Sequence, residues 1–163
     1  MKKIAIYPGT FDPVTYGHID LIRRATKIFE HVIVAVVRHP QKSVLFSNKE
    51  REQMLKIATQ GIPRMSIESF CGLLVNYVRR KKARVMVRGL RMISDFEYEF
   101  QMALTNRRLD PGIETVYMMP NEAYCYLSSK LIKEAASLGA NLKDFVPDFV
   151  EEKLKKALNK KYK

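Results

Sequence analysis

The most informative polar residues of the sequence lie in a short glycine- and proline-containing segment, residues 7–18, which reads YPGTFDPVTYGH. In this segment Thr10 and the spaced pair Thr15-x-x-His18 stand between a short apolar run and a pattern of helical periodicity. A loop that joins a strand to a helix directs backbone N–H groups and the positive end of the helix at one point, and this arrangement suits an anion. A lone histidine at a helix start is commonly structural, so its role depends on the residues that share its site. By itself the segment predicts an anion site of unspecified purpose.

Three further segments carry bases or hydroxyls where a predicted strand ends. They are residues 38–42 (RHPQK), 88–91 (RGLR) and 124–130 (YCYLSSK). The carboxyl ends of parallel strands meet at one edge of a sheet, so these segments are expected to face residues 9–18 across one site. Glycines allow close backbone approach, hydroxyls donate to phosphate oxygens, and arginine and lysine neutralise them. The predicted ligand is therefore a polyphosphate.

The sequence also narrows the chemistry. It contains neither the glycine-lysine phosphate loop nor the dinucleotide fingerprint, and it shows no obvious catalytic carboxylate pair, serine triad or zinc cluster. Phosphate transfer without a covalent intermediate works by positioning and by charge stabilisation, for which an imidazole donor, cationic side chains and Mg²⁺ are suited.

The elements that must position these residues alternate along the chain. Apolar runs predict strands at 3–7, 31–37, 65–70, 83–87 and 115–119, and amphipathic patterns lie between them. Capping boxes predict helix starts at Ser47–Glu50 and Ser94–Glu97, and Pro147 with Asp148 opens a last helix. The predicted fold class is α/β: a Rossmann-like, five-stranded parallel sheet with helices on both faces, plus C-terminal helices. Residues 1–163 are expected to form a single domain, with a basic helical tail at about 148–163.

Charge and composition bound the other possibilities. The formal net charge of +12 favours polyanionic ligands, although six lysines crowd the tail, where they are expected to line the solvated face of a helix. We expect no membrane segment or export signal and a cytoplasmic location. Cys71 and Cys125 lack metal-ligand spacing and suit a reducing compartment.

Taken in order, the motifs resemble those of one known family. Residues 7–13, then Thr15-x-Gly17-His18, then 88–91 and 95–99 are similar in sequence and spacing to blocks of the bacterial phosphopantetheine adenylyltransferases, within the nucleotidyltransferase superfamily that carries a T/H-x-G-H motif. The similarity extends to about Val150. One short block would be weak, whereas the ordered set is specific.

The resemblance implies reversible transfer of AMP from ATP to 4′-phosphopantetheine, which yields dephospho-CoA and pyrophosphate in the penultimate step of coenzyme A biosynthesis. The acceptor phosphate would attack the α-phosphorus directly. The resemblance also implies Mg²⁺ as cofactor, a homohexamer and feedback inhibition by coenzyme A. It does not indicate which residues would ligate the metal.

The resemblance assigns roles to residues of this chain. His18 would stabilise the transition state, Thr10 would hold the attacking phosphate, and Lys42 and Arg88 would neutralise it; these four are the expected catalytic residues. The pantetheine arm would contact Leu74, Met102 and Asn106. The residues expected at ATP are Thr10, Phe11, His18, Gly89, Leu90, Arg91, Glu99, Tyr124, Cys125, Tyr126, Leu127, Ser128, Ser129 and Lys130.

At two positions the chain departs from the family pattern. Tyr16 stands where the family usually has asparagine, and Lys130 stands where it commonly has serine or threonine. Lys130 either reaches the β or γ phosphate of ATP or points to solvent from the first turn of its helix.

Two other functions fit parts of the sequence. A nucleotidyltransferase of the same superfamily could use a nicotinamide nucleotide or glycerol phosphate as acceptor, although Lys42, Leu74 and Arg88 argue against it. A basic nucleic-acid-binding module is suggested by the charge and the lysine-rich tail. The sequence shows no interleaved aromatic and basic stripe, so no specific nucleic-acid partner is expected.

Overall fold

The computed structural model describes residues 3–38 and 43–159 and contains a five-stranded parallel sheet. The strand order is β3-β2-β1-β4-β5, with every neighbouring pair parallel. The strands are β1 (Ile4–Gly9), β2 (His31–Val37), β3 (Met65–Phe70), β4 (Val85–Gly89) and β5 (Glu114–Met118). The α/β, Rossmann-like fold predicted from the apolar runs is confirmed, with each strand within two residues of its expected bounds.

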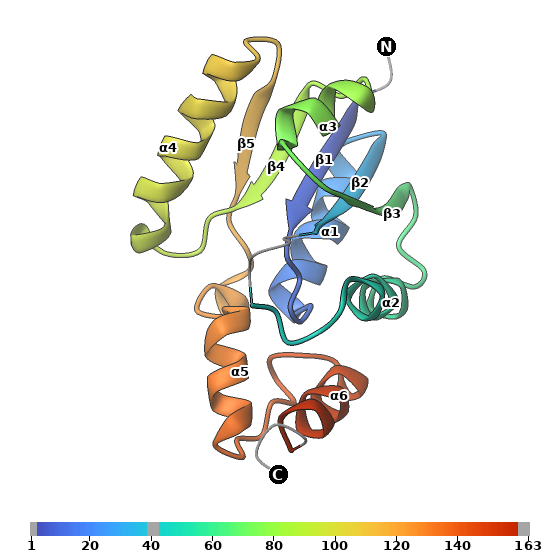
Figure 1. Cartoon of the computed structure of the whole chain (residues 1–163), viewed down its shortest axis with the longest axis vertical. Helices are drawn as coiled ribbons and strands as arrows, with labels where there is room; N and C mark the ends of the chain where they lie inside the picture. Colours follow the sequence, from blue (N-terminus) through green and yellow to red (C-terminus); the bar gives the residue numbers. More distant parts are fainter. Residues whose placement is uncertain (1–2, 39–42, 160–163) are drawn as a thin grey trace.

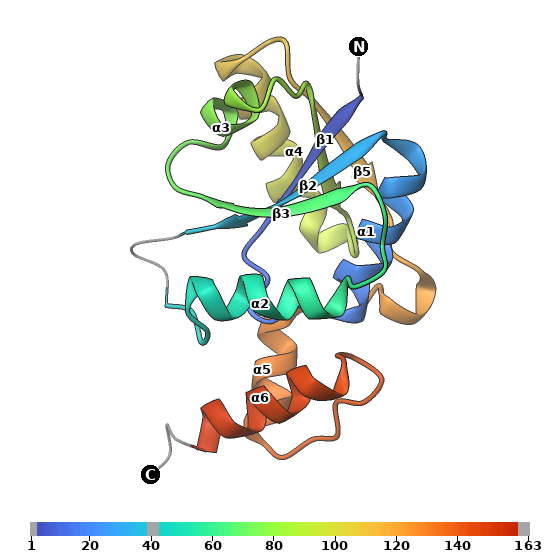
Figure 2. The same cartoon turned by 90° about the vertical axis from the view of Figure 1, so that its right-hand side faces the viewer.

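Helices connect the strands and cover both faces of the sheet. They are α1 (Tyr16–Ile28), α2 (Asn48–Ala58), α3 (Leu74–Arg80), α4 (Ile93–Leu109), α5 (Ser129–Ser137) and α6 (Asp148–Asn159), with a short 3₁₀ helix η1 (Glu122–Tyr124). Figure 1 shows α5 and α6 beyond the carboxyl ends of the strands, and α4 alongside β5. Figure 2 shows that α2 and α3 lie on different sides of the sheet.

Alternate residues of the central strands enter two separate cores. In β1, Ala5 and Tyr7 join the larger core formed with α1, α2, α5 and α6, while Ile6 joins the smaller core beneath α3. Side chains of a strand point alternately to opposite faces, so an unbroken apolar run is needed where both faces are covered. This explains why the sequence of β1 and β2 shows no polar alternation.

The C-terminal helix belongs to the larger core through one side only. Val150 and Leu154 of α6 are fully buried and Leu158 nearly so, although lysines alternate with them. The expected solvated basic face is therefore one side of a helix whose other side is packed. Of the helices that the structure describes, none combines the length and apolarity needed to cross a membrane.

Of the two predicted capping boxes, one is confirmed and one is wrong. Ser47 and Glu50 cap each other's free N–H groups at the start of α2. In contrast, α4 begins one residue before Ser94, and its N-cap residue Met92 makes no side-chain cap bond. Asp95, which directly follows Ser94, is paired with Arg91, and both side chains line the cleft described below.

Candidate active site

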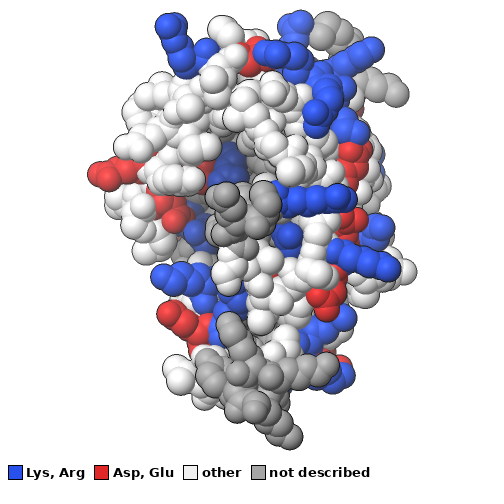
Figure 3. Space-filling view, in the orientation of Figure 1, with Lys and Arg blue, Asp and Glu red and all other residues white. Residues whose placement is uncertain are grey.

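A cleft of about 910 Å³ opens at the carboxyl ends of the strands. Its walls come from the β1–α1 loop, the end of β4, the inner side of α4 and the start of α5. In Figure 3 this face is hollowed near its centre, with Lys and Arg side chains in and around the hollow. Three of the four segments that the sequence analysis placed at one sheet edge, 9–18, 88–91 and 124–130, thus contribute residues to this cleft, whereas Arg38, the described residue of 38–42, is not in its lining.

His18 is held at the start of α1 by Thr15, the N-cap residue. The Thr15 hydroxyl accepts from the His18 N–H, and the Thr15 N–H donates to His18 Nδ1 at 3.1 Å. Because Nδ1 accepts this bond, the proton of the neutral ring lies on Nε2. The Thr15-x-x-His18 spacing is therefore a capping box in which the imidazole takes the place usually held by a glutamate. It leaves an Nε2–H donor on a ring that lines the cleft.

The surroundings of His18 favour its neutral form. Desolvation by burial, followed by the charges of Arg91 and Arg88, lowers its pKa from 6.5 to about 4. The Phe11 ring meets the imidazole edge-on, with 5.0 Å between ring centroids. At neutral pH His18 is thus an uncharged hydrogen-bond donor, suited to an oxygen on which negative charge develops.

Arg88, at the end of β4, is fixed by a buried carboxylate. Its Nε donates to Glu99 Oε2 at 2.9 Å, a second nitrogen pairs with Oε1, and Nη1 donates to the Pro8 carbonyl at 3.0 Å. Burial opposes the charge of Arg88, but the hydrogen bonds and charge of Glu99 outweigh it and raise the arginine pKa. A guanidinium has five N–H donors, so two remain after these three bonds. Arg88 can therefore contact an anion without leaving Glu99.

Arg91 joins three parts of the cleft. It pairs with Asp95 through two nitrogens, at 3.1 and 3.2 Å, and its Nη1 donates to the Leu127 carbonyl at 2.7 Å. Leu127 immediately precedes the N-cap of α5, where Ser128 accepts from the Leu131 N–H. The end of β4 is thus tied to the start of α5.

Two glycines permit the close approach of these segments. A Cβ added at Gly9 would lie 2.7 Å from the Phe11 ring, and one at Gly89 would lie 2.6 Å from Leu21 Cδ1. Both distances are far inside van der Waals contact, so a larger residue would displace the side chains behind the loop. Gly9 and Gly89 therefore allow the close packing of the cleft wall.

The three carboxylates that line the cleft are all paired with bases: Asp12 with Lys133, Asp95 with Arg91, and Glu99 with Arg88. Nowhere in residues 3–38 and 43–159 do three or more potential metal-ligating side chains cluster. The cleft thus offers cations and N–H groups for phosphate, and the described part of the protein supplies no carboxylate cage for a metal.

Most of the predicted site residues line this cleft. They are Thr10, Phe11, His18, Leu74, Arg88, Gly89, Arg91, Glu99, Met102, Asn106, Leu127, Ser128, Ser129 and Lys130. Lys42 lies outside the described residues.

Four predicted ATP contacts are not part of the cleft lining. The Leu90 N–H donates to the Met118 carbonyl, and Cys125 Sγ contacts the Glu122 carbonyl. Tyr126 is half exposed against Phe145. Tyr124, the fourth, lies beside Tyr16 outside the lining.

The two departures from the family pattern have different surroundings. The centroids of the Tyr16 and Tyr124 rings are 6.0 Å apart, and the backbone N–H of Tyr16 donates to the Phe145 carbonyl. Tyr16 therefore joins the loop to the C-terminal region and is not part of the cleft lining. Lys130, by contrast, is exposed and lines the cleft next to Ser129.

Sequence reasoning gave no role to Asp12, Arg51 or Lys133. Asp12 accepts from the N–H groups of Leu45 and Phe46, both at 2.9 Å, and from Lys133 Nζ at 2.6 Å. The available signal was weak: Asp12 lies inside the opening motif, but its partners are 33 to 121 residues away. Only the folded chain brings them together.

Comparison with known proteins identifies the class to which this chain belongs. Residues 6–135 match the family model described as cytidylyltransferase-like. By fold and site the protein is therefore a nucleotidyltransferase of that family. A structure from Vibrio parahaemolyticus, provisionally described as a nicotinate-nucleotide adenylyltransferase, has a TM-score of 0.68 over 94% of this chain and 99% of its own, at 18% identity, which supports the fold alone.

Closer relatives specify the member of the class. Over 158 residues the chain is 51% identical to a phosphopantetheine adenylyltransferase of Caldanaerobacter subterraneus subsp. tengcongensis, covering 97% of this chain and 99% of the relative. It is 48% identical over 159 residues to the Clostridium botulinum enzyme of the same name, and the match covers 98% of this chain and 97% of the relative. The chain belongs to the phosphopantetheine adenylyltransferase family.

Proposed function

We propose that this protein transfers AMP from ATP to 4′-phosphopantetheine, giving dephospho-CoA and pyrophosphate, the penultimate step of coenzyme A biosynthesis. The observation that carries the proposal is the convergence of His18, Arg88 and Arg91 with the hydroxyl-bearing start of α5 on one cleft, in a chain of this family. Neutral donors and fixed cations are what a phosphoryl-type transfer needs, because its transition state spreads negative charge over phosphate oxygens.

The reaction that we propose is one direct displacement. A phosphate oxygen of the acceptor forms a bond to the α-phosphorus of ATP while the bond from that phosphorus to the bridging oxygen breaks, and pyrophosphate leaves with its electron pair. His18 donates from Nε2 to an oxygen that gains charge. Thr10 holds the attacking phosphate, and Arg88 and Lys42 neutralise it.

The rest of the cleft divides between the two substrates. We assign the pantetheine arm to Leu74, Met102 and Asn106, and the ATP to the opposite part of the cleft. The ATP contacts proposed are Thr10, Phe11, His18, Gly89, Leu90, Arg91, Glu99 and the segment 124–130. Within this segment we propose that the exposed Lys130 reaches the β or γ phosphate, since the other lysine of the helix start, Lys133, is already paired with Asp12.

Nucleotidyltransferases generally use a divalent metal, and we propose Mg²⁺ here. Mg²⁺ commonly keeps several waters and binds through substrate phosphates, which fits a cleft whose carboxylates are all paired with bases. When bound, it would neutralise phosphate charge and orient the triphosphate. We name no protein ligand for it.

Several assignments beyond the reaction are part of the proposal. Residues 1–163 form one domain, the protein acts in the cytoplasm, and coenzyme A inhibits it. We also propose a homohexamer. Its support is the exposed apolar side of α4, where Ile93 is 93% exposed and the half-exposed rings of Phe96 and Phe100 stack at 5.6 Å.

One assay tests the proposal. Purified protein is mixed with Mg-ATP and either 4′-phosphopantetheine, nicotinamide mononucleotide or glycerol phosphate, and pyrophosphate release is followed. Release with phosphopantetheine alone is expected. Release with another acceptor would keep the nucleotidyltransferase class but change the substrate, and no release with any of the three would refute the proposed reaction.

A further inference from the structure

Arg51 is a buried cation that lies behind the cleft. It stands in the first turns of α2 and is only 2% exposed. A positive side chain near a helix N-terminus is electrostatically unfavourable, and burial of a charge adds a desolvation cost. Burial accordingly lowers the pKa of Arg51, although arginine stays protonated in proteins. A residue with two such costs needs specific compensation.

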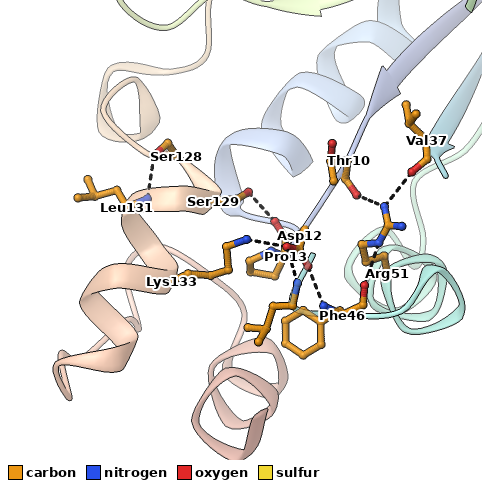
Figure 4. A network of polar contacts seen from close by, with 11 residues as sticks. Thr10, Asp12, Pro13, Val37, Phe46, Arg51, Ser128, Ser129, Leu131 and Lys133 are labelled. Atoms are coloured by element: carbon orange, nitrogen blue, oxygen red, sulfur yellow. Dashed lines mark hydrogen bonds and ion pairs between the residues drawn. The ribbon is translucent and has the colours of Figure 1, made fainter. Parts of the chain in front are cut away.

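The compensation consists of hydrogen bonds to neutral oxygen atoms. Arg51 Nη1 donates to the carbonyls of Thr10 at 2.7 Å and Val37 at 3.1 Å, and Nε donates to the Phe46 carbonyl at 3.2 Å. Nη2 donates to the Asn48 side chain at 3.3 Å. Figure 4 shows Arg51 extending from α2 toward Val37 at the end of β2 and toward Thr10 in the β1–α1 loop. One guanidinium thus fixes three segments that are distant in sequence.

The nearby carboxylate is occupied by other partners. Asp12 binds the N–H groups of Leu45 and Phe46 and pairs with Lys133 of α5 (Figure 4). The Phe46 residue therefore donates to Asp12 with its N–H and accepts from Arg51 with its carbonyl. Asp12 is itself fixed from α5, so the loop is held from two helices.

The bond to Thr10 has a direct consequence for the cleft. In a planar trans peptide the N–H points opposite to the C=O. With the Thr10 carbonyl directed at Arg51, which is not part of the cleft lining, the N–H of Phe11 is turned away from Arg51. Phe11 also has φ of 52°, a left-handed conformation that costs energy for a residue with a side chain. The loop therefore depends on its neighbours to keep this geometry.

We propose that Arg51 is a positioning residue for adenylyl transfer: it binds the Thr10 carbonyl from the buried side and so fixes the Thr10–Phe11 peptide with the Phe11 N–H facing the phosphates. The inference rests on the proposed function. Arg51 touches no substrate itself and acts through the loop.

The test compares two substitutions with a stability control. Arg51→Lys keeps the charge but loses the planar guanidinium that donates to three carbonyls. Arg51→Met removes the charge and the hydrogen bonds. Thr59→Ala removes the side-chain bond to the Leu55 carbonyl at the far end of α2, away from the cleft, and reports what loosening this helix does by itself. For each protein, Tm, kcat, the two KM values and the equilibrium Kd for ATP are measured.

A misplaced reacting group costs on the order of 10- to 100-fold in rate, so Arg51→Lys is expected to lower kcat by about that factor and Arg51→Met by more. The Kd for ATP should change much less than kcat, and Thr59→Ala should lower Tm with kcat retained. Arg51→Lys with kcat within twofold of the parent would overturn the inference. So would a loss of kcat that Thr59→Ala reproduces at equal loss of Tm.

A second readout does not need turnover, which separates this inference from the proposed reaction. Amide hydrogen exchange of residues 10–12 is measured in the parent and in Arg51→Lys, with exchange of residues 4–7 of β1 as internal reference. Faster exchange confined to the loop is expected. Unchanged exchange there would overturn the inference even if the parent is fully active, whereas an inactive parent with faster loop exchange would refute only the reaction.

Discussion

The protonation state of His18 gives the sharpest prediction from the cleft. The perturbation is a pH titration of the free protein from pH 8 to pH 4. His18 is expected to stay neutral throughout the physiological range and to titrate at about 4, with its proton on Nε2. Burial of the ring is the largest cause, and the charges of Arg91 and Arg88 add to it.

The magnitude follows from the size of the pKa change. One pKa unit corresponds to about 1.4 kcal/mol, so lowering the pKa from 6.5 to about 4 disfavours the imidazolium by roughly 3 kcal/mol. The unfolded chain takes up this proton below pH 6.5, but the folded protein does so only near pH 4. Because the unfolded state binds more protons in that interval, the free energy of unfolding falls as the pH drops from 6.5 to 4.

The assay is imidazole ¹⁵N NMR of the ligand-free protein, with the His18 resonances assigned from His18→Gln. Kinetics are less suitable because ATP and the acceptor phosphate titrate in the same range. Arg91→Met, which removes the larger of the two charge contributions, should raise the pKa of His18 toward 6.5. A His18 pKa near 6.5 in the parent, or a proton on Nδ1, would refute the reasoning.

Three further predictions concern single side chains. His18→Ala should lower kcat by about 10²-fold or more with modest change in substrate affinity, as expected for loss of one preorganised donor; steady-state and binding measurements check this, and a loss confined to binding would contradict it. Lys130→Ser should raise the KM for ATP, while the exposed control Lys143→Ser should not; equal KM values in both variants would assign Lys130 to solvent. Glu99→Gln removes the charge that compensates the partly buried Arg88, and it should lower the free energy of unfolding, measured by urea titration, by about 1–3 kcal/mol. The control Glu152→Gln, in the exposed Lys156–Glu152 pair, should lower it by less than about 1 kcal/mol. An equal loss of unfolding free energy in the two variants would show that the Arg88–Glu99 pair stabilises the protein no more than an exposed pair does.

Hydrophobic pattern and turn chemistry made much of the fold predictable. Unbroken apolar runs such as 31–37 indicate strands covered on both faces, and β2 occupies those residues. The Ser47 capping box gave the start of α2 within one residue. The same kind of motif failed at Ser94, because α4 already begins at Ile93 and Met92, which has no hydrogen-bonding oxygen in its side chain, occupies the N-cap position.

The candidate cleft was predicted in part. Residues in motifs that follow strands, such as Arg88 and Lys130, line it, because the carboxyl ends of parallel strands must share an edge. Residues that act through long-range hydrogen bonds were missed. Arg51 had no visible role, since its carbonyl partners reveal nothing in the sequence about where they will lie.

The sequence by itself determined the order of strands and helices, the edge at which the ligand residues gather and, through its motifs, the family. Those properties depend on local periodicity and on residue types at fixed spacing. The tertiary structure decided the low pKa of His18, the pairing of Asp12 and Glu99 with bases and the anchoring of the loop by Arg51. These depend on burial and on contacts between residues as far as 121 positions apart, which no local pattern encodes.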